Sequence, residues 1–475
     1  MWLSITIILL LLFTLFNYLV HDGDYFEPSF IFSFVFFISA LFCVLEQKTY
    51  AIEFHFETFF ILAICLTSFS LSSLLFKTYN QNYHTRKSSI RQLEEIIIPK
   101  SYLIILIIIQ LLTIYFFSKH ILTFSVMYDG KHRSLIQSVD LYDKIFKFHN
   151  HVYKKINAPL SPIYRIGDPL SRAGGFLMLY VAVNNYLVKK KIDLLNIVPV
   201  LGVCVIIFLR GSRSPLFRVF TMAAFLFYFL GIRYKVISKG SLTILKRVIA
   251  VLLLFGCSMI LLLPLMGRKS SSESGGVLTY LFIYIGAPLL NLDMFLSGDN
   301  VKFMSSVSNN AFGNFTFMGL YSMLNEWFGF ENYNPDIAVT FTNSSNGLKT
   351  GNVYTHFYKL TYDFGLLGGA LVNLIVVLYY TLSYHNLLYS YNKNKRIDFR
   401  LFLYSYLFND LVMSMFSTRF FETVLTTSFL KVMIVAWMFN YLFIEREISI
   451  KNFTLSIRKK NKLTDLMIDM INAKK

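Results

Sequence analysis

The sequence predicts an all-α fold, that of an integral membrane protein that crosses the bilayer many times. Among its 475 residues, 55% are hydrophobic and only 15% are charged. Apolar runs of about 18 to 21 residues, the length that a helix needs to cross a bilayer, recur along the chain. Each run must be helical, because a helix satisfies its own backbone N–H and C=O groups where water is absent.

The apolar runs define about eleven predicted membrane spans within a single membrane domain. A twelfth candidate at 278–296 contains Gly286, Pro288 and Asp293, so it either dips into the membrane or lies along it. The first run predicts a retained helix, because it lacks the basic start and cleavage site of a signal peptide. The eleven runs are 2–20, 29–46, 58–76, 101–118, 174–188, 192–209, 215–232, 246–266, 364–384, 400–417 and 424–444.

Cysteine usage, charge and motifs exclude several functions. Cys43, Cys65, Cys204 and Cys257 each fall in a separate apolar run, so we expect neither disulfides nor a metal site. The net charge is +18, but the basic residues lie in loops and at helix ends, which indicates orientation in a bilayer and argues against nucleic acid as a partner. Motifs for nucleotide or metal cofactors are absent from the sequence.

Charge in the loops predicts which side of the membrane each loop faces. Short loops rich in Lys and Arg stay in the cytoplasm, and this rule places the basic tail at 445–475 inside. The regions 119–173 and 267–363 are then large external loops, which suggests that the function resides on that face. The same scheme places the acidic stretch Asp22–Glu27 inside, with no Lys or Arg in that stretch to hold it. The four basic loops are 77–100, 189–191, 233–247 and 385–400.

Arginines gather at the predicted external face. Arg210 and Arg213 follow the sixth span, and their fixed guanidinium donors suit a phosphate or diphosphate. Alternatively, both side chains reach lipid headgroups. Arg268 and Arg419 lie on the same face, where each alone would be read as an interfacial anchor. Their shared position favours an anion-binding site.

A third group of polar residues lies at 351–368, directly before a predicted span. His356 or Asp363 could take a proton from a sugar hydroxyl, and Tyr354 and Tyr358 could stack on pyranose rings. The alternative for the carboxylate is that it caps the helix that follows it.

Asp410 lies in the middle of a predicted span, where an unpaired carboxylate is costly. We expect it to have a hydrogen-bonded partner inside the protein. A role in proton-coupled transport is the alternative.

Three stretches resemble the O-antigen polymerase family, the Wzy-type oligosaccharide repeat-unit polymerases. They are Arg210-Gly-Ser-Arg213, Asn352-Val-Tyr-Thr355 and Tyr362-Asp-Phe-Gly365, the last followed by Gly368. The resemblance implies a GT-C-like helical glycosyltransferase at the periplasmic face of a bacterial inner membrane. Its substrates would be oligosaccharides linked to undecaprenyl diphosphate, and a chain-length regulator protein would be its partner.

This resemblance leads to a mechanistic hypothesis that needs no cofactor, because a lipid diphosphate is a good leaving group once cationic side chains neutralise its negative charge. Asp363 or His356 would orient or deprotonate the attacking hydroxyl, while Tyr354 and Tyr358 would line the sugar path. The residues expected to bind the diphosphate are Arg210, Arg213 and Arg268, with Arg419 as a further contact. An O-antigen ligase or another lipid-linked glycosyltransferase is the nearest alternative, and a flippase or transporter comes next.

Overall fold

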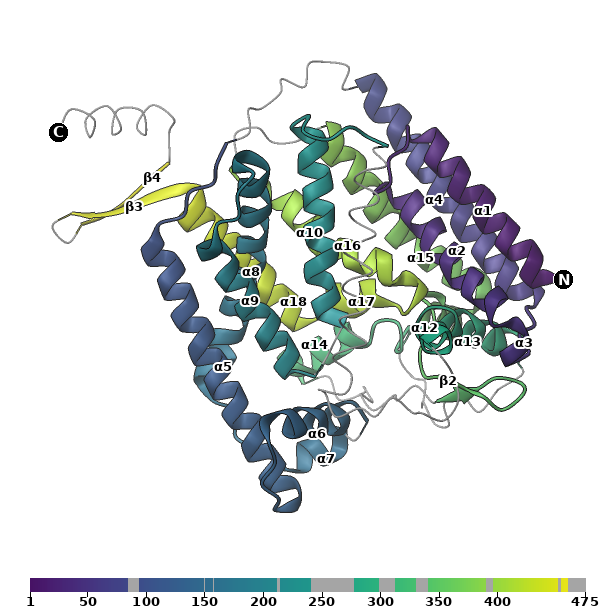
Figure 1. The fold of residues 1–475 in the computed structure, drawn as a ribbon, viewed down its shortest axis with the longest axis horizontal. Coiled ribbons are helices and arrows are strands. Elements are labelled where there is room, and N and C mark those ends of the chain that lie inside the picture. The colour runs from purple at the N-terminus through teal and green to yellow at the C-terminus, as the bar shows by residue number, and fades with distance from the viewer. Residues whose placement is uncertain are drawn as a thin grey trace.

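The chain folds into a helical bundle in the computed structural model (Figure 1). The structure describes residues 1–83, 94–148, 150–156, 158–211, 214–240, 277–298, 312–329, 341–389, 396–451 and 454–459. The helices of the first half are α1 Trp2–Val20, α2 Pro28–Leu45, α3 Gln47–Tyr50, α4 Phe56–Tyr83, α5 Lys100–Asp129, α6 Leu135–Phe148, α7 Asn150–Ile156, α8 Pro162–Lys189, α9 Leu194–Leu209 and α10 Ser214–Arg233.

The second half contains more broken helices and two small hairpins. Its helices are α12 Val277–Ile285, α13 Ala287–Leu296, α14 Met318–Phe328, α15 Phe357–Tyr389, α16 Phe399–Val412, α17 Arg419–Val424 and α18 Thr427–Phe439. A 3-10 turn at Met413–Met415 follows α16, and a π-helical turn at Asn440–Ile444 follows α18. Antiparallel hairpins are formed by β1 Thr342–Asn343 with β2 Lys349–Gly351, and by β3 Arg446–Lys451 with β4 Thr454–Lys459.

The all-α membrane class is therefore confirmed for the described part of the chain. Six helices there are long and apolar enough to cross a membrane, namely α1, α2, α4, α5, α10 and α15. Shorter apolar helices lie at Leu194–Leu209, Ala287–Leu296 and Thr427–Leu442. The predicted span at 246–266 lies outside the described residues.

Two helices begin earlier than their apolar runs. Helix α8 begins at Pro162, after Ser161 caps its first turn by accepting from the backbone N–H of Ile163. The apolar run begins only at 174, because the first turns of α8 carry charged side chains. Helix α5 continues to Asp129, so both ends of the region 119–173 are helical. Helix α15 likewise begins at Phe357 and contains a kink at Gly365, instead of beginning at 364.

Three other predicted spans are interrupted. The twelfth candidate, 278–296, consists of the short helices α12 and α13, which meet at Gly286. The run 400–417 ends as a helix at Val412, and the run 424–444 changes from α-helix to π-helical turn at Asn440.

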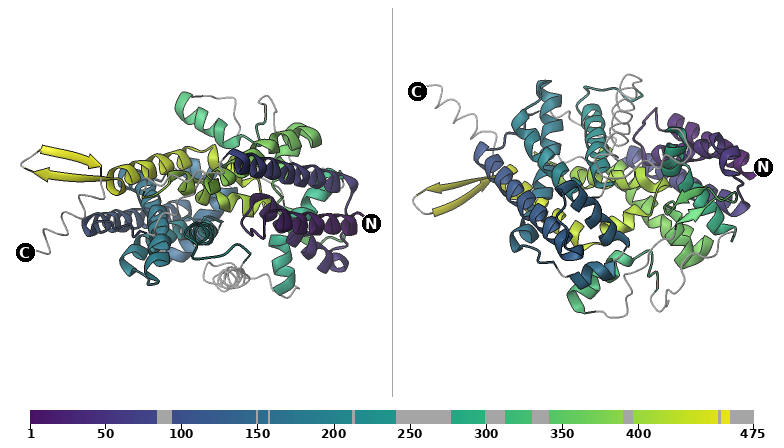
Figure 2. Two further views of the ribbon diagram at one scale, coloured as in Figure 1. Left: turned by 90° about the horizontal axis from the view of Figure 1, so that it is seen from above. Right: turned by 60° about the horizontal axis from the view of Figure 1, so that its bottom comes forward.

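The bundle has three parts that pack side by side (Figure 1). Helices α1, α2, α4 and α15 form one part, and α5, α8 and α9 form another, with α10, α16 and α18 between them. Close packing of α8 on α9 requires Gly175, because a Cβ there would lie 2.0 Å from Val203 Cγ2 and 2.8 Å from the Pro199 carbonyl oxygen. The β3–β4 hairpin extends away from the helices (Figure 2).

At one end of the bundle, two lysines hold the acidic stretch between α1 and α2. Lys77 Nζ donates to the Val20 carbonyl at 2.6 Å and pairs with Asp22 at 3.0 Å. Lys239 Nζ lies 3.3 Å from Asp24 Oδ2. The acidic stretch therefore shares this end, called the basic end below, with the last turns of α4 and the segment after α10.

The opposite end, called the α17 end below, is where α12, α13 and α17 lie (Figure 1). His55 Nδ1 lies 2.8 Å from Asp293 Oδ2, which ties α13 to the start of α4. The β1–β2 hairpin lies against α3, where Asn346 donates to the Thr49 carbonyl at 2.7 Å. Helices α6, α7 and α14 lie toward this end as well (Figure 1).

Candidate functional site

The segment between α16 and α18 leaves regular helix and is fastened to the start of α15. The backbone N–H of His356 donates to the Ser414 carbonyl at 2.7 Å. The Thr418 hydroxyl donates to the His356 carbonyl at 2.9 Å. Irregular backbone inside a membrane protein is stable only where its polar groups find partners, and these bonds supply some of them. The short helix α17 is thereby held beside α15.

A buried ion pair joins α10 to α16. Arg218 Nη2 donates to Asp410 Oδ1 at 2.6 Å, and the Asp410 side chain is 0% exposed. The same guanidinium donates to Tyr406 OH at 2.9 Å and to Thr423 Oγ1 on α17 at 3.0 Å. The expected internal partner of Asp410 is thus confirmed, and it is Arg218.

A second carboxylate, on α8, is shared by two arginines. Arg172 Nη2 and Arg210 Nη2 each lie 2.7 Å from an oxygen of Asp168. Arg210 also donates to Tyr164 OH at 3.0 Å, and Arg172 donates to Ser428 Oγ on α18 at 2.8 Å. Burial opposes the charge of Arg210, but Asp168 and Tyr164 outweigh it and raise its pKa above the ordinary value. Arg210 therefore stays charged.

A third carboxylate, on α17, is also shared by two cations. Lys359 Nζ lies 2.8 Å from Glu422 Oε1, and Arg419 Nη1 lies 3.5 Å from Glu422 Oε2. Burial opposes ionisation of Glu422, yet the two cations outweigh it and lower the pKa of its carboxyl. Glu422 is consequently ionised at neutral pH.

These three groups converge on the stretch Arg419–Ser428, and we call them the cationic cluster. Among the described residues they comprise five cations and three carboxylates, which leaves two positive charges in excess. Arg210 and Arg419 keep 34% and 30% of their side chains exposed, so part of the cluster is accessible. Several of its nitrogens and oxygens are buried and have no hydrogen-bond partner in the described part of the chain, including Nε of Arg210, Arg218 and Arg419.

The two predicted proton acceptors have protein partners. Both oxygens of Asp363 accept backbone N–H groups, from Phe315 at 3.3 Å and from Thr316 at 2.6 Å. The expected alternative was a cap on the helix that follows Asp363, but the bonds of this carboxylate go to the backbone at 315–316 instead. His356 is buried, its Nε2 lies 2.9 Å from Asn373 Oδ1, and burial lowers its pKa to about 4.

The two predicted sugar-stacking tyrosines lie inside the protein. The rings of Tyr354 and Tyr358 stack on each other with centroids 4.2 Å apart. Phe295 and Phe315 contact Tyr358 edge to face, at 4.8 and 5.6 Å. Both tyrosines are buried, so in this conformation they form part of the packing that supports the start of α15.

The structure brings together Arg210, Arg419 and the His356 segment, while Arg213 and Arg268 lie outside the described residues. Sequence reasoning missed Arg172, Arg218 and Glu422 as parts of the site. Arg218 carried a usable signal, because it is an arginine one turn inside an apolar run, where a charge is rarely idle.

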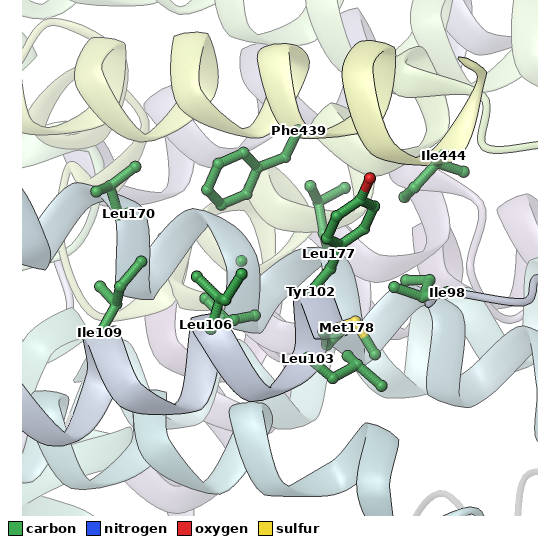
Figure 3. A pocket seen from close by; sticks show the side chains of 12 residues that line it. Ile98, Tyr102, Leu103, Leu106, Ile109, Leu170, Leu177, Met178, Phe439 and Ile444 are labelled. Atoms are coloured by element: carbon green, nitrogen blue, oxygen red, sulfur yellow. The ribbon is translucent and has the colours of Figure 1, made fainter. Parts of the chain in front are cut away.

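An apolar groove runs along α8 between α5 and the end of α18 (Figure 3). It has a volume of about 260 Å³. One end lies at Leu170, which in the sequence falls between Asp168 and Arg172 of the cationic cluster. The groove and the cluster therefore meet at the same level of α8. The side chains labelled in Figure 3 are Ile98, Tyr102, Leu103, Leu106, Ile109, Leu170, Leu177, Met178, Phe439 and Ile444.

Comparisons with protein-family models, with curated proteins and with solved structures find no match to this chain.

Proposed function

We propose that this chain is a membrane glycosyltransferase that polymerises oligosaccharide repeat units carried on undecaprenyl diphosphate, as the O-antigen polymerases do. The reaction would take place at the periplasmic face of a bacterial inner membrane. The growing glycan would leave its lipid diphosphate and form a bond to a hydroxyl of the incoming unit. The freed lipid diphosphate would keep the electrons of the broken bond, and the hydroxyl would lose its proton.

The observation that carries this proposal is the excess of two positive charges in the cationic cluster. A diphosphate that leaves gains negative charge, and fixed arginine donors stabilise that charge without reorganising. Arg210 and Arg419 are the partly exposed members, so they are placed to meet the diphosphate, with Arg172 behind them.

The apolar groove supports a lipid-linked substrate. A polyprenyl diphosphate needs an apolar surface for its chain and cations for its head, and here the two meet along α8. Pockets lined mostly by apolar side chains with a few convergent charged groups are typical ligand sites. The isoprenoid chain would follow the groove from Leu170 toward Met178.

In this proposal Glu422 replaces Asp363 and His356 as the proton acceptor. Glu422 is ionised, and 24% of its side chain is exposed. Asp363 is a positioning residue, because it holds the backbone at Phe315 and Thr316 against α15.

The test is lipopolysaccharide laddering in a deletion strain complemented with variants. We expect Arg172→Ala, Arg419→Ala and Glu422→Gln to abolish or strongly shorten the ladder while the protein level stays unchanged. Arg133→Ala is the matched control, because Arg133 also pairs with an aspartate four residues before it, but away from the cluster. Full ladders from all three cluster variants would contradict the proposal.

The same assay separates polymerase from ligase, which would need the same diphosphate-binding groups. Loss of a polymerase leaves one repeat unit on the lipid core, whereas loss of a ligase removes all attached glycan. We expect single-unit lipopolysaccharide in the deletion strain. Complete loss of attached glycan would assign the cluster to ligation.

A further inference from the structure

A second polar cluster lies at the basic end. The sequence predicts no metal site or cofactor anywhere in the chain. Glu27 is 1% exposed, and it lies between His21 and His385, which are also buried. His21 Nε2 lies 3.9 Å from Glu27 Oε2, and His385 Nε2 lies 3.8 Å from Glu27 Oε1. One potential ligand atom from each of the three residues lies within 4.8 Å of the others.

The cluster is built by segments that are distant in the sequence. His21 and Glu27 come from the turn between α1 and α2, and His385 comes from the last turns of α15. Glu27 also caps α2, because one of its oxygens accepts the backbone N–H groups of Ser29 at 2.8 Å and Phe30 at 3.1 Å. Ser73 of α4 donates its hydroxyl to Glu27 and lies 2.9 Å from His385 Nε2. The carboxylate is thus held in one orientation.

Among the residues that the structure describes, neither a lysine nor an arginine pairs with Glu27. The two lysines nearby are each engaged by another carboxylate, Lys77 by Asp22 and Lys239 by Asp24. Among the described residues, the ion-pair partners of Glu27 are the two histidines alone. A buried carboxylate requires a compensating cation or proton.

Two imidazole nitrogens of the cluster, His21 Nε2 and His385 Nδ1, are also buried with no hydrogen-bond partner among the residues that the structure describes. A small cavity adjoins them, lined by His21, Asp24, Glu27, Lys77 and His385 among others, with a volume of about 20 Å³. That volume is about what one water-sized occupant needs.

We propose that His21, Glu27 and His385 bind one divalent transition-metal ion, with Zn²⁺ as the best match. Two imidazoles and one carboxylate form a ligand set that Zn²⁺ adopts with a fourth ligand from a hydroxyl or water. With metal–ligand bonds of about 2.0–2.2 Å, tetrahedral ligand atoms lie about 3.4 Å apart. The distances of 3.9 and 3.8 Å go to the two different oxygens of Glu27, and the three ligand atoms lie within 4.8 Å of one another. Binding of an ion would therefore draw the ligand atoms together by up to about 1.4 Å. Ser73 Oγ is the nearest hydroxyl.

Such an ion would fasten the α1–α2 turn to α15. It would neutralise Glu27 and give the orphan nitrogen of His21 a partner. Because its ligands come from distant parts of the sequence, the ion would stabilise the folded protein. It would lie at the basic end, and so it would take no part in chemistry at the α17 end.

The test uses full-length protein, purified in detergent without a histidine tag and without chelator. We expect elemental analysis to find about one metal ion per chain, and Co²⁺ added after metal removal to give the visible absorption of a tetrahedral site. Zn²⁺ should raise the Tm of the wild-type protein. His21→Ala, His385→Ala and Glu27→Gln should each weaken Zn²⁺ binding at least tenfold, and Glu27→Gln keeps an oxygen that can cap α2.

His120→Ala is the matched control, because His120 is a buried histidine remote from the cluster whose Nδ1 lies 3.1 Å from the Pro159 carbonyl oxygen. It should bind Zn²⁺ as the wild type does. If a ligand variant fails to fold, the Co²⁺ spectrum of the wild-type protein still decides the matter. A wild-type protein that retains no metal and gives no tetrahedral spectrum would overturn the proposal, and so would equal Zn²⁺ affinity in the wild type and a folded His21→Ala/His385→Ala variant.

Discussion

The ion pair of Arg218 and Asp410 shows what one residue contributes to the interior of this bundle. A charge is expensive inside a membrane protein, and a buried pair repays that cost only when its hydrogen bonds are nearly complete. Arg218 meets this condition by contacting Asp410, Tyr406 and Thr423 at once. The pair therefore connects α10, α16 and α17, and it positions the cationic cluster.

We predict that Arg218→Ala destabilises the protein by about 3–5 kcal/mol, because it leaves the Asp410 carboxylate buried and unpaired. Replacing both partners, as in Arg218→Met with Asp410→Leu, should cost clearly less than the single change. Thermal unfolding of the purified variants in detergent measures both effects. Additive losses in the double variant would show that the two side chains do not act as a pair.

The sequence revealed part of the site at this scale. Asp410 stood out because it is a charged residue inside an apolar run, and Arg210 stood out because it is a basic residue at the predicted external end of a span. Arg172 did not, because its charge is explained only by Asp168 one turn before it and by Ser428, which lies far away in the sequence. Pairing across helices depends on packing, and packing is not visible in a linear pattern of apolar runs.

At the scale of elements, hydrophobicity located most helices but misplaced several ends. The predicted span 174–188 is shorter than α8, because the charged turns before residue 174 are also helical and their side chains pair with one another. The run at 400–417 overstated α16, because the segment at 413–418 bonds to His356 instead of continuing the helix. Apolar content measures where a chain prefers lipid, whereas the end of a helix depends on local hydrogen-bond partners.

Helix α14 gives a prediction at this scale, because it lies directly on the end of α17. A Cβ at Gly319 would lie 2.4 Å from the Leu425 carbonyl oxygen, which belongs to the backbone and cannot rotate away. We predict that Gly319→Ala displaces α14, costs about 1–3 kcal/mol and shortens the polysaccharide ladder. Thermal unfolding and laddering measure these effects.

Ser322→Ala is the control for this change, because Ser322 is exposed on the same helix. It should leave the Tm and the ladder as in the wild type. If Gly319→Ala behaves like this control, α14 does not need close contact with α17.

At the scale of the whole molecule, the segments between the helices gather at two ends of the bundle, the basic end and the α17 end. Asp22 and Asp24 pair with Lys77 and Lys239 at the basic end, so the acidic stretch, which has no basic residue of its own, receives one lysine from α4 and one from the segment after α10. The charge rule reads each loop separately, and it therefore could not see this compensation. The hairpin β1–β2 and helix α6 lie at the other end (Figure 1).

We predict that cysteines at the two ends react from opposite sides of the membrane. In a cysteine-free background, Lys144→Cys on α6 and Lys349→Cys on β2 should react with an impermeant maleimide in cells whose outer membrane is permeabilised. Asp22→Cys should react only after the inner membrane is opened. Equal reactivity of all three in intact inner membranes would exclude a cytoplasmic basic end.

The kink in α15 has a consequence for how the two halves of the molecule are joined. Gly365 adopts φ 69° and ψ −179°, a conformation that is essentially restricted to glycine. The short helical segment that carries Lys359 and Asp363 can therefore have a different axis direction from the longer segment, which ends near His385. A side chain at Gly365 would disfavour the kink and bring the two helical segments closer to collinear. Lys359 would then move away from its partner Glu422, although no charged residue had been substituted.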